Sequence, residues 1–178
     1  MTSADQIRLR ALAGGDHDHI TWALYAAIGW DPQRRLRPFD VALSHPDLAV
    51  YHEGWGRSGD IGVVAESDGM FAGIAFCRLF TAADRGHCYV DDATPELAVA
   101  VEEDWRGRGV GTSLLSSLAA EVRRAGSGSH SLSVDPANPA RRLYERLGYR
   151  EVAVDEQGVR MILDLREASR EQVPPGLC

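Results

Sequence analysis

The chain has 178 residues, of which 44% are hydrophobic and 25% charged, a composition typical of a globular protein and not of a disordered one. Its 26 acidic and 19 basic residues give a formal net charge of −7, which argues against a nucleic-acid-binding protein. All 19 cations are arginine, which excludes chemistry that needs a lysine: a Schiff base, a pyridoxal phosphate linkage, a lysine general base or the lysine of a nucleotide phosphate loop.

The length fits one domain, which we expect to span 1–167 and to be followed by a mobile tail at 168–178. The three cysteines stand far apart with no C-x-x-C pair, so neither a disulfide framework nor a zinc site is expected. The N-terminus lacks the apolar core of a signal peptide, and no apolar run approaches the roughly 20 residues that span a bilayer. We therefore expect a cytoplasmic protein without a membrane partner.

The N-terminal half is predicted to combine one strand, two helical stretches and a hairpin. Alternating apolar residues predict a strand at 6–12, and Asp16 is expected to cap a helix at 18–28. A second helical stretch at 39–52 is interrupted by Pro46. Strands at 61–65 and 70–80 are expected to form a hairpin through a tight turn at 67–69.

The C-terminal half is predicted to alternate strands and helices. A strand at 96–103 precedes a helix over Val110–Arg124, which ends before Gly126. A short strand follows at 131–134, and Asn138 and Pro139 are expected to open a helix that stops at Gly148. A last hairpin is expected from strands at 149–154 and 159–165.

The sharpest motif is the glycine-rich run RGRGVGT at 106–112, which lies between a predicted strand and a predicted helix. Glycines there allow a tight turn, and the free N–H groups at a helix start attract anions such as a pyrophosphate. A nucleotide phosphate loop is excluded because it needs a lysine, and the dinucleotide fingerprint fits poorly because the third glycine comes one residue early. An ordinary glycine-rich turn is the remaining alternative.

The motif gains specificity from its neighbours, which are ELAVAV at 96–101, VDPANPA at 134–140 and LYERLGY at 143–149. This combination closely resembles the GNAT superfamily of acyl-CoA N-acyltransferases, whose [QR]-x-x-G-x-[GA] signature is matched by Arg106 through Gly111. The motifs cover about 95–154, and the element order extends the resemblance over nearly the whole chain. It implies an α/β (α+β) fold with a mixed, mostly antiparallel seven-stranded sheet, about four flanking helices and a splay between strands 4 and 5.

The resemblance also implies how acetyl-CoA would be held. The pyrophosphate would lie on the loop formed by Arg106, Gly107, Arg108, Gly109, Val110, Gly111 and Thr112. The pantetheine amides would pair with the backbone of Val99, Ala100 and Val101. Asn138 would contact the pantetheine arm, and Arg141 would contact the 3′-phosphate. Alternatives remain open: Asn138 is also a suitable helix N-cap, and Arg108 and Arg142 could be solvated surface charges.

For catalysis, the resemblance implies that Tyr144 protonates the departing thiolate; a packed core tyrosine is the alternative. Glu96 is the candidate general base because, on a regular strand, it shares a face with the small Ala98 and Ala100. Its alternative is a solvated carboxylate at a strand end. The aromatic residues of the flanking segments are expected to pack and not to bind ligand: Trp30, Tyr51, Trp55 and Tyr89. His17 and His19 are attributed to a capped helix start, and no metal is expected.

The sequence therefore predicts an N-acetyltransferase in which a primary amine attacks acetyl-CoA directly in a ternary complex. The acceptor would be a small molecule or a peptide, and no nucleic acid or membrane partner is expected. The resemblance leaves a homodimer open because dimers are common in the family. The alternative function is a non-catalytic acyl-CoA-binding or regulatory domain on the same fold.

Overall fold

The computed structural model describes residues 6–33, 36–156 and 158–166. Its helices and strands follow the order expected from the sequence, with the interrupted helical stretch forming two separate helices. Their bounds are β1 (Arg8–Ala11), α1 (His17–Ile28), α2 (Phe39–Leu43), α3 (Pro46–His52), β2 (Ile61–Ser67), β3 (Met70–Arg78), β4 (Glu96–Val101), α4 (Val110–Arg124), β5 (Ser129–Val134), α5 (Arg141–Arg146), β6 (Arg150–Asp155) and β7 (Gly158–Asp164). The expected tail at 168–178 lies outside the described residues.

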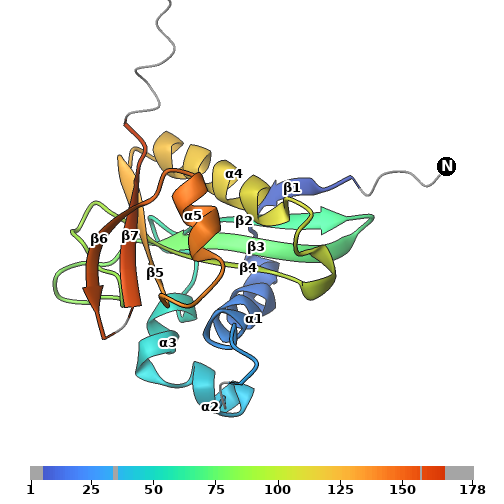
Figure 1. The fold of residues 1–178 in the computed structure, drawn as a ribbon, viewed down its shortest axis with the longest axis horizontal. Helices are drawn as coiled ribbons and strands as arrows, with labels where there is room; N and C mark the ends of the chain where they lie inside the picture. Colours follow the sequence, from blue (N-terminus) through green and yellow to red (C-terminus); the bar gives the residue numbers. More distant parts are fainter. Residues whose placement is uncertain (1–5, 34–35, 157, 167–178) are drawn as a thin grey trace, which may run out of the picture.

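The seven strands form one sheet in the order β1-β2-β3-β4-β5-β7-β6. The strand pairs are antiparallel except for β4 with β5, which run parallel. In Figure 1 the β5–β7–β6 strands run at a steep angle to β2, β3 and β4, so the sheet consists of two differently oriented halves. The predicted mixed sheet with a splay between strands 4 and 5 is confirmed.

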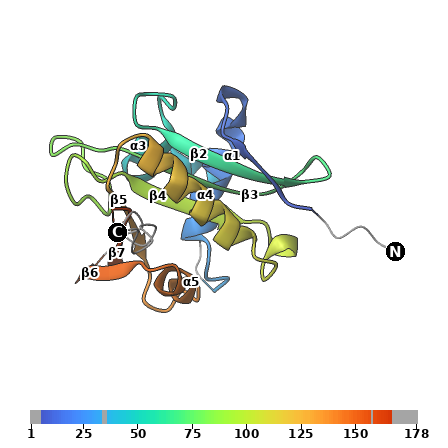
Figure 2. The same cartoon turned by 90° about the horizontal axis from the view of Figure 1, so that it is seen from above.

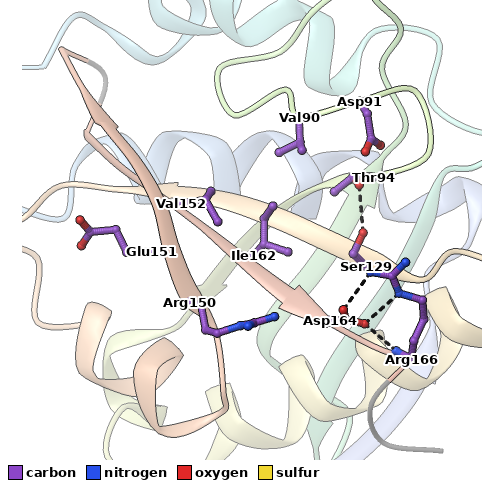
Figure 3. A pocket seen from close by; sticks show the side chains of 10 residues that line it. All are labelled: Val90, Asp91, Thr94, Ser129, Arg150, Glu151, Val152, Ile162, Asp164 and Arg166. Carbon is purple, nitrogen blue, oxygen red and sulfur yellow. Dashed lines mark hydrogen bonds and ion pairs between the residues drawn. The ribbon is translucent and has the colours of Figure 1, made fainter.

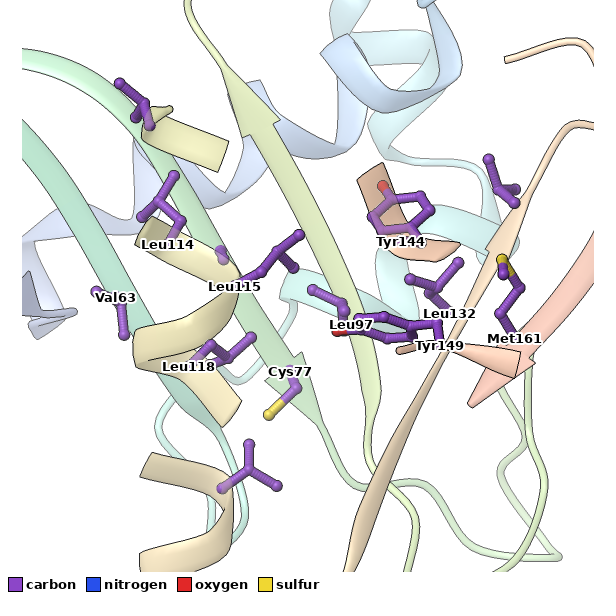
Figure 4. Packing of buried hydrophobic residues seen from close by; sticks show 14 of the residues in the cluster. Val63, Cys77, Leu97, Leu114, Leu115, Leu118, Leu132, Tyr144, Tyr149 and Met161 are labelled. Atoms are coloured by element: carbon purple, nitrogen blue, oxygen red, sulfur yellow. The ribbon is translucent and has the colours of Figure 1, made fainter. Parts of the chain in front are cut away.

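Helices cover both faces of the N-terminal half of the sheet, and each face has its own apolar core. Helix α4 lies along one face, whereas α1, α2 and α3 lie on the other (Figures 1 and 2). Residues of α4 such as Leu114 and Leu118 pack with Val63, Cys77 and the C-terminal strands (Figure 4). On the opposite face, Ile20 and Leu24 of α1 pack against β2 and β3. Alternation along the strands supplies one set of side chains to each core.

Two local predictions about chain turns are confirmed by backbone geometry. Asp68 and Gly69 both have positive φ, +50° and +79°, which is the pattern of a type I′ turn that matches the twist of a hairpin. Gly126 follows α4 with φ of +95°, and the amide of Ser127 donates to the carbonyl of Val122, as in a helix C-terminus closed by glycine.

Two other local predictions are wrong in detail. Asp16 does not cap α1 with its side chain; its carboxylate accepts from the amide of Ala13 at 2.8 Å and from Arg10 at 2.7 Å. The strand predicted at 96–103 ends at Val101, because Glu103–Trp105 form a 3₁₀ turn. In the first case the carboxylate binds residues that precede the helix in place of the helix amides. In the second the amide of Trp105 donates to the carbonyl of Glu102 and closes the turn.

A buried histidine lies in the core beneath the C-terminal half of the sheet. His130 on β5 is fully buried, and its Nε2 is 2.8 Å from the hydroxyl of Tyr149, with the two rings stacked. Burial lowers the pKa of His130 to about 4, because the charged ring would lose its hydration. The folded protein therefore binds this proton less tightly than the unfolded chain does.

This shift predicts that stability falls as the pH is lowered from about 6.5 to 4. Between pH 7 and pH 4.5 the His130 contribution to the free energy of unfolding should drop by about 2 kcal/mol. Urea titrations at both pH values should show this loss in the parent protein and a smaller one in His130→Gln. His45→Gln, at an exposed histidine, is the control. An equal loss in the parent and in His130→Gln would refute the assignment.

Candidate active site

The site is built around the point where β4 and β5 separate. All six residues of β4 pair with β3, whereas the described pairing of β4 with β5 is limited to Glu96 with Ser131. The amide of Ser131 donates to the carbonyl of Pro95 at 2.9 Å just before the strands diverge. Beyond this point the β5-facing edge of β4 has no described strand partner, so the main chain of Val99 and the amide of Val101 can pair with the amides of an extended ligand. Ala100 lies between them, and its own N–H and C=O face β3, because antiparallel pairing alternates and the next pair toward β3 is Glu102 with Ala72.

The glycine-rich run forms the turn that enters α4. Gly107 and Gly109 have φ of +73° and +83°, a left-handed conformation that glycine adopts at no steric cost. Gly109 is the N-cap residue, and the helix begins at Val110. The first helical N–H groups, those of Val110, Gly111 and Thr112, have no carbonyl to pair with inside the helix. With the helix dipole, these groups are able to attract an anion.

The two arginines of this turn have local contacts. The Nε of Arg106 donates to the carbonyl of Val101 at 3.1 Å, which ties the turn to the end of β4. The guanidinium of Arg108 lies 5.1 Å from the ring centroid of Trp105. Both side chains are exposed at the rim of the turn, where each can still donate to a phosphate.

The helix predicted to open at Asn138 and Pro139 begins two residues later, at Arg141. Asn138 still caps the turn that leads into this helix, because its Oδ1 accepts a hydrogen bond from the amide of Ala140 at 2.9 Å. This bond uses the oxygen of the carboxamide and leaves the Asn138 NH₂ as the group that can meet a ligand. The N-cap interpretation of Asn138 is therefore supported in substance, although the helix bound was wrong.

Arg141 at the start of α5 is held by two carboxylates. Its Nε donates to Glu145 at 2.9 Å and one terminal nitrogen donates to Glu151 at 3.0 Å. The side chain is about one-third exposed, so a phosphate would have to share the guanidinium with these acids. Arg142 is exposed, as its surface interpretation predicted.

Tyr144 belongs to the apolar core under α4 and α5. It is 8% exposed, and its ring is 5.6 Å from that of Tyr149 (Figure 4). Burial raises the pKa of Tyr144 to about 12, so the hydroxyl keeps its proton at neutral pH. Among the described residues none hydrogen-bonds to this hydroxyl. The packed-core interpretation is correct, and the same geometry keeps a protonated donor available.

Glu96 is 1% exposed, which overturns the alternative of a solvated carboxylate at a strand end. Three donors converge on its Oε2: the hydroxyl of Tyr51 at 2.6 Å, and the amide and the thiol of Cys88, each at 3.2 Å. Its Oε1 is buried and has no hydrogen-bond partner among the described residues. Ala98 and Ala100 pack in the core on the α1 side of the sheet, together with Tyr51.

The partners of Glu96 are themselves held in place. The amide of His87 donates to the Tyr51 hydroxyl at 2.7 Å, and Ser131 donates to the carbonyl of Cys88 at 3.1 Å. Burial, followed by the charge of Glu96, raises the pKa of the Cys88 thiol well above its usual value. Cys88 is therefore a protonated donor and not a thiolate nucleophile.

A buried ion pair fixes α3, the helix that carries Tyr51. Arg78 and Asp60 are each 1% exposed and are joined by two hydrogen bonds of 2.9 and 2.7 Å. Arg78 also donates to the carbonyls of Val50 and Glu53 at the end of α3. Trp55, expected to pack, lies under the Arg78 guanidinium at 5.3 Å from ring centroid to carbon.

Two cavities adjoin this region. One of about 380 Å³ lies on the outer face of β5, β6 and β7, with Arg150 and the ion pair of Asp164 and Arg166 on its walls (Figure 3). Its described lining contains none of the residues predicted for the site. The other, of about 300 Å³, is lined by residues of α1, α2 and α3 and by His87. Because the backbone amide of His87 donates to the Tyr51 hydroxyl, this cavity lies next to a partner of Glu96.

Within the described ranges no group of three or more His, Cys, Asp or Glu side chains is placed to hold a metal ion. His17 packs against His52 and His19 stacks on Phe71, so each has an aromatic partner. No helix among the described residues is long and apolar enough to cross a membrane.

Sequence reasoning found the carboxylate but missed most of its environment. Tyr51 was expected to pack and does, yet it also donates to Glu96, 45 positions away. Cys88 was considered only as an unpaired cysteine. Neither contact leaves a short-range pattern, because the residues come from different elements. The available signal was the polar loop before β4, which contains Cys88 and returns to the start of that strand.

The comparisons with known proteins agree with the fold. The acetyltransferase (GNAT) domain family matches residues 58–151, more than half of the chain. A Salmonella typhimurium acetyltransferase structure, described with its cofactor acetyl-CoA, is 25% identical in sequence to this chain and superposes with a TM-score of 0.65. The match covers 97% of this chain and 99% of that one. The sequence matches no curated protein sequence significantly.

Two further structures share the fold at lower identity. A GNAT-family acetyltransferase from Staphylococcus aureus Mu50 is 14% identical with a TM-score of 0.67, covering 90% of this chain and 99% of that one. The ribosomal-protein-S18-alanine N-acetyltransferase of Escherichia coli is 19% identical with a TM-score of 0.60, covering 90% and 94%.

The buried ion pair predicts a large cost for removing its acid. Asp60→Asn should lower the free energy of unfolding by about 3–5 kcal/mol, because Arg78 would remain buried without its counter-charge. Asp84→Asn removes an exposed acid 3.8 Å from Arg57 and should cost less than about 1 kcal/mol. Urea unfolding at pH 7 measures both. Similar small losses in the two variants would contradict the anchoring role of Arg78 and Asp60.

Proposed function

This chain belongs to the GNAT acetyltransferase family, and we propose that it transfers an acetyl group from acetyl-CoA to a primary amine. The observation that carries the proposal is the combination of an open β4 edge with the glycine turn at the start of α4. The edge offers main-chain groups to the pantetheine amides, and the turn offers N–H groups to the pyrophosphate.

The residues assigned to the cofactor divide into main-chain and side-chain contacts. Of the three residues assigned to the pantetheine arm, Val99 and Val101 contribute backbone groups and Ala100 lies between them, so the chemical nature of their side chains matters little. The amides of the turn at 107–112 and the guanidinium groups of Arg106 and Arg108 bind the pyrophosphate. Asn138 contributes its NH₂ near the pantetheine arm, and Arg141 reaches the 3′-phosphate while retaining Glu145 and Glu151 as neighbours.

Acetyl-CoA supplies the acetyl group as a thioester, and residues of the chain accept and donate the protons. Glu96 accepts a proton from the amine, which must be neutral or become neutral as it attacks. Tyr144 donates its hydroxyl proton toward the sulfur as the carbon–sulfur bond breaks. Cys88 takes no covalent part, because its thiol is protonated and donates to Glu96. The amine therefore attacks directly within a ternary complex.

The acceptor enters from the α1–α3 side of the sheet, the side on which Glu96, Ala98 and Ala100 lie. The cavity of about 300 Å³ on this side has apolar walls from Ile28 and Leu48 and polar groups from Asp47 and His87. This lining suits the amine end of a small molecule or of a peptide. The non-catalytic acyl-CoA-binding domain stays the second candidate, since it would use the same cofactor contacts.

A thiol-release assay with acetyl-CoA and a broad panel of amines tests the function. We expect amine-dependent release of free thiol, with kcat/KM lowered on the order of 10²–10⁴-fold in Glu96→Gln and in Tyr144→Phe. Binding of acetyl-CoA, measured by calorimetry, should be nearly unchanged in Glu96→Gln. Tight cofactor binding without turnover of any amine would favour the non-catalytic alternative, and full turnover in Tyr144→Phe would remove its role as the acid.

The pyrophosphate site makes a separate prediction. Gly109→Ala should strain a residue with φ of +83° by about 1–2 kcal/mol and displace the N–H groups of the turn, so the Kd for coenzyme A should rise several-fold. Gly126→Ala is a matched control, since it has φ of +95° at the other end of α4 and open space at its Cβ, like Gly109. Equal cofactor affinity in both variants would argue against the turn as the phosphate site.

A further inference from the structure

The hydrogen bonds of Glu96 are distributed unequally between its two oxygens. The Tyr51 hydroxyl, the Cys88 amide and the Cys88 thiol all donate to Oε2. Oε1 is buried, yet it has no partner in the described chain. A buried acceptor without a donor is costly, so an unpaired carboxylate oxygen in an otherwise satisfied cluster calls for an explanation.

The nearest element offers a cation that could have neutralised Glu96 and does not. Arg78 stands opposite Glu96 in the β3–β4 register, so their side chains emerge on the same face of the sheet. Its guanidinium is instead engaged by Asp60 and by the carbonyls of Val50 and Glu53. Asp60 therefore keeps the arginine away from Glu96, and the carboxylate is held by neutral donors.

The other titratable groups around Glu96 have contacts of their own. On α1, His17 pairs with His52, His19 with Phe71, and Tyr25 donates to the carbonyl of Arg37, while Asp18 is exposed. On β7, Arg160 donates to Asp155 and is close enough to Cys88 for its charge to favour the thiolate. From the segment before β4, His87 contributes its backbone amide, which binds Tyr51 and not the carboxylate.

The backbone packs against the face of the same carboxylate at Gly86. A Cβ at this position would collide with both oxygens and the carboxyl carbon of Glu96. The segment 86–88 therefore covers the group closely, and the carboxylate has little freedom to rotate. Because the carboxylate cannot rotate, Oε1 and Oε2 do not exchange positions, and each keeps its own set of neighbours.

From these contacts we propose that Tyr51 and Cys88 are positioning residues that fix Oε2 of Glu96, so that Oε1 is the oxygen that receives the proton of the acceptor amine. The inference rests on the proposed function, because it assigns roles within the same site. The N–H bond of the amine breaks as its nitrogen bonds to the acetyl carbon, and the proton passes to Oε1. The carbon–sulfur bond of the thioester breaks, and the leaving thiolate takes the proton of Tyr144. Donors on Oε2 hold that oxygen and leave the lone pairs of Oε1 available.

The proposal makes a prediction for Tyr51→Phe. Loss of the 2.6 Å hydrogen bond frees Oε2 from its shortest contact, so the acid limb of the kcat/KM pH profile should move to higher pH. At neutral pH kcat should fall roughly tenfold or more, while the KM for acetyl-CoA stays the same. Cys88→Ala should move the limb in the same direction by less, since both of its bonds are longer and its amide remains.

Tyr149→Phe is the matched control, because it also removes a buried tyrosine hydroxyl but one that bonds to His130 on the other face of the sheet. It should leave the acid limb in place. An acid limb that does not move in Tyr51→Phe, or that moves equally in Tyr149→Phe, would overturn the positioning role.

A second measurement separates this inference from the proposed function. Infrared difference spectra between the parent protein and Glu96→Gln isolate the Glu96 carboxyl band in the free protein, without any turnover. The frequency of this band should differ between the Tyr51→Phe background and the parent at the same pH, because the carboxyl group has lost its shortest hydrogen bond. A shifted band in a protein that turns over no amine would support the positioning of Oε2 by Tyr51 and contradict the proposed acetyl transfer. Normal turnover with an unshifted band would contradict the positioning role and support acetyl transfer.

Discussion

The structure depends on one interruption in main-chain pairing. Two parallel strands at the centre of a sheet normally share hydrogen bonds along their length, yet β4 and β5 meet at Glu96 and Ser131 and then separate. Polar backbone groups in the gap need partners, since buried amides and carbonyls are costly when left unpaired. An extended ligand that carries its own amides would meet that need, so the edge that weakens the sheet is also the edge proposed to bind the cofactor.

The point of separation is stabilised by buried polar groups drawn from four parts of the chain. Glu96 from β4, Tyr51 from α3, Cys88 from the preceding segment and Ser131 from β5 form one connected set of hydrogen bonds. Such a network is stabilising only when its members are satisfied. The single unsatisfied atom, Oε1 of Glu96, is therefore the place where the arrangement gives up stability, as is common where a structure serves a reaction.

Patterns of short range predicted the elements well. The helix over Val110–Arg124 was located from its apolar spacing and terminal glycine, and the hairpin at Asp68 and Gly69 from its turn residues. The glycine turn and Asn138 were found because each acts on the next few residues. The burial of Glu96, the pairing of Arg78 with Asp60 and the true partners of Asp16 could not be predicted in this way. Each depends on which distant segment covers the residue, and the alternation of a strand does not encode that.

The narrow connection between the halves of the sheet has a mechanical consequence. A single bridged residue pair acts like a pivot, so the angle between β4 and β5 is set by the side chains wedged beneath the two strands. Leu97, Leu132 and Tyr144 belong to that wedge. A change of one methyl group at Leu97 or Leu132 would alter the width of the opening without changing the backbone groups that line it. The width of the opening between β4 and β5 therefore depends partly on residues of the core.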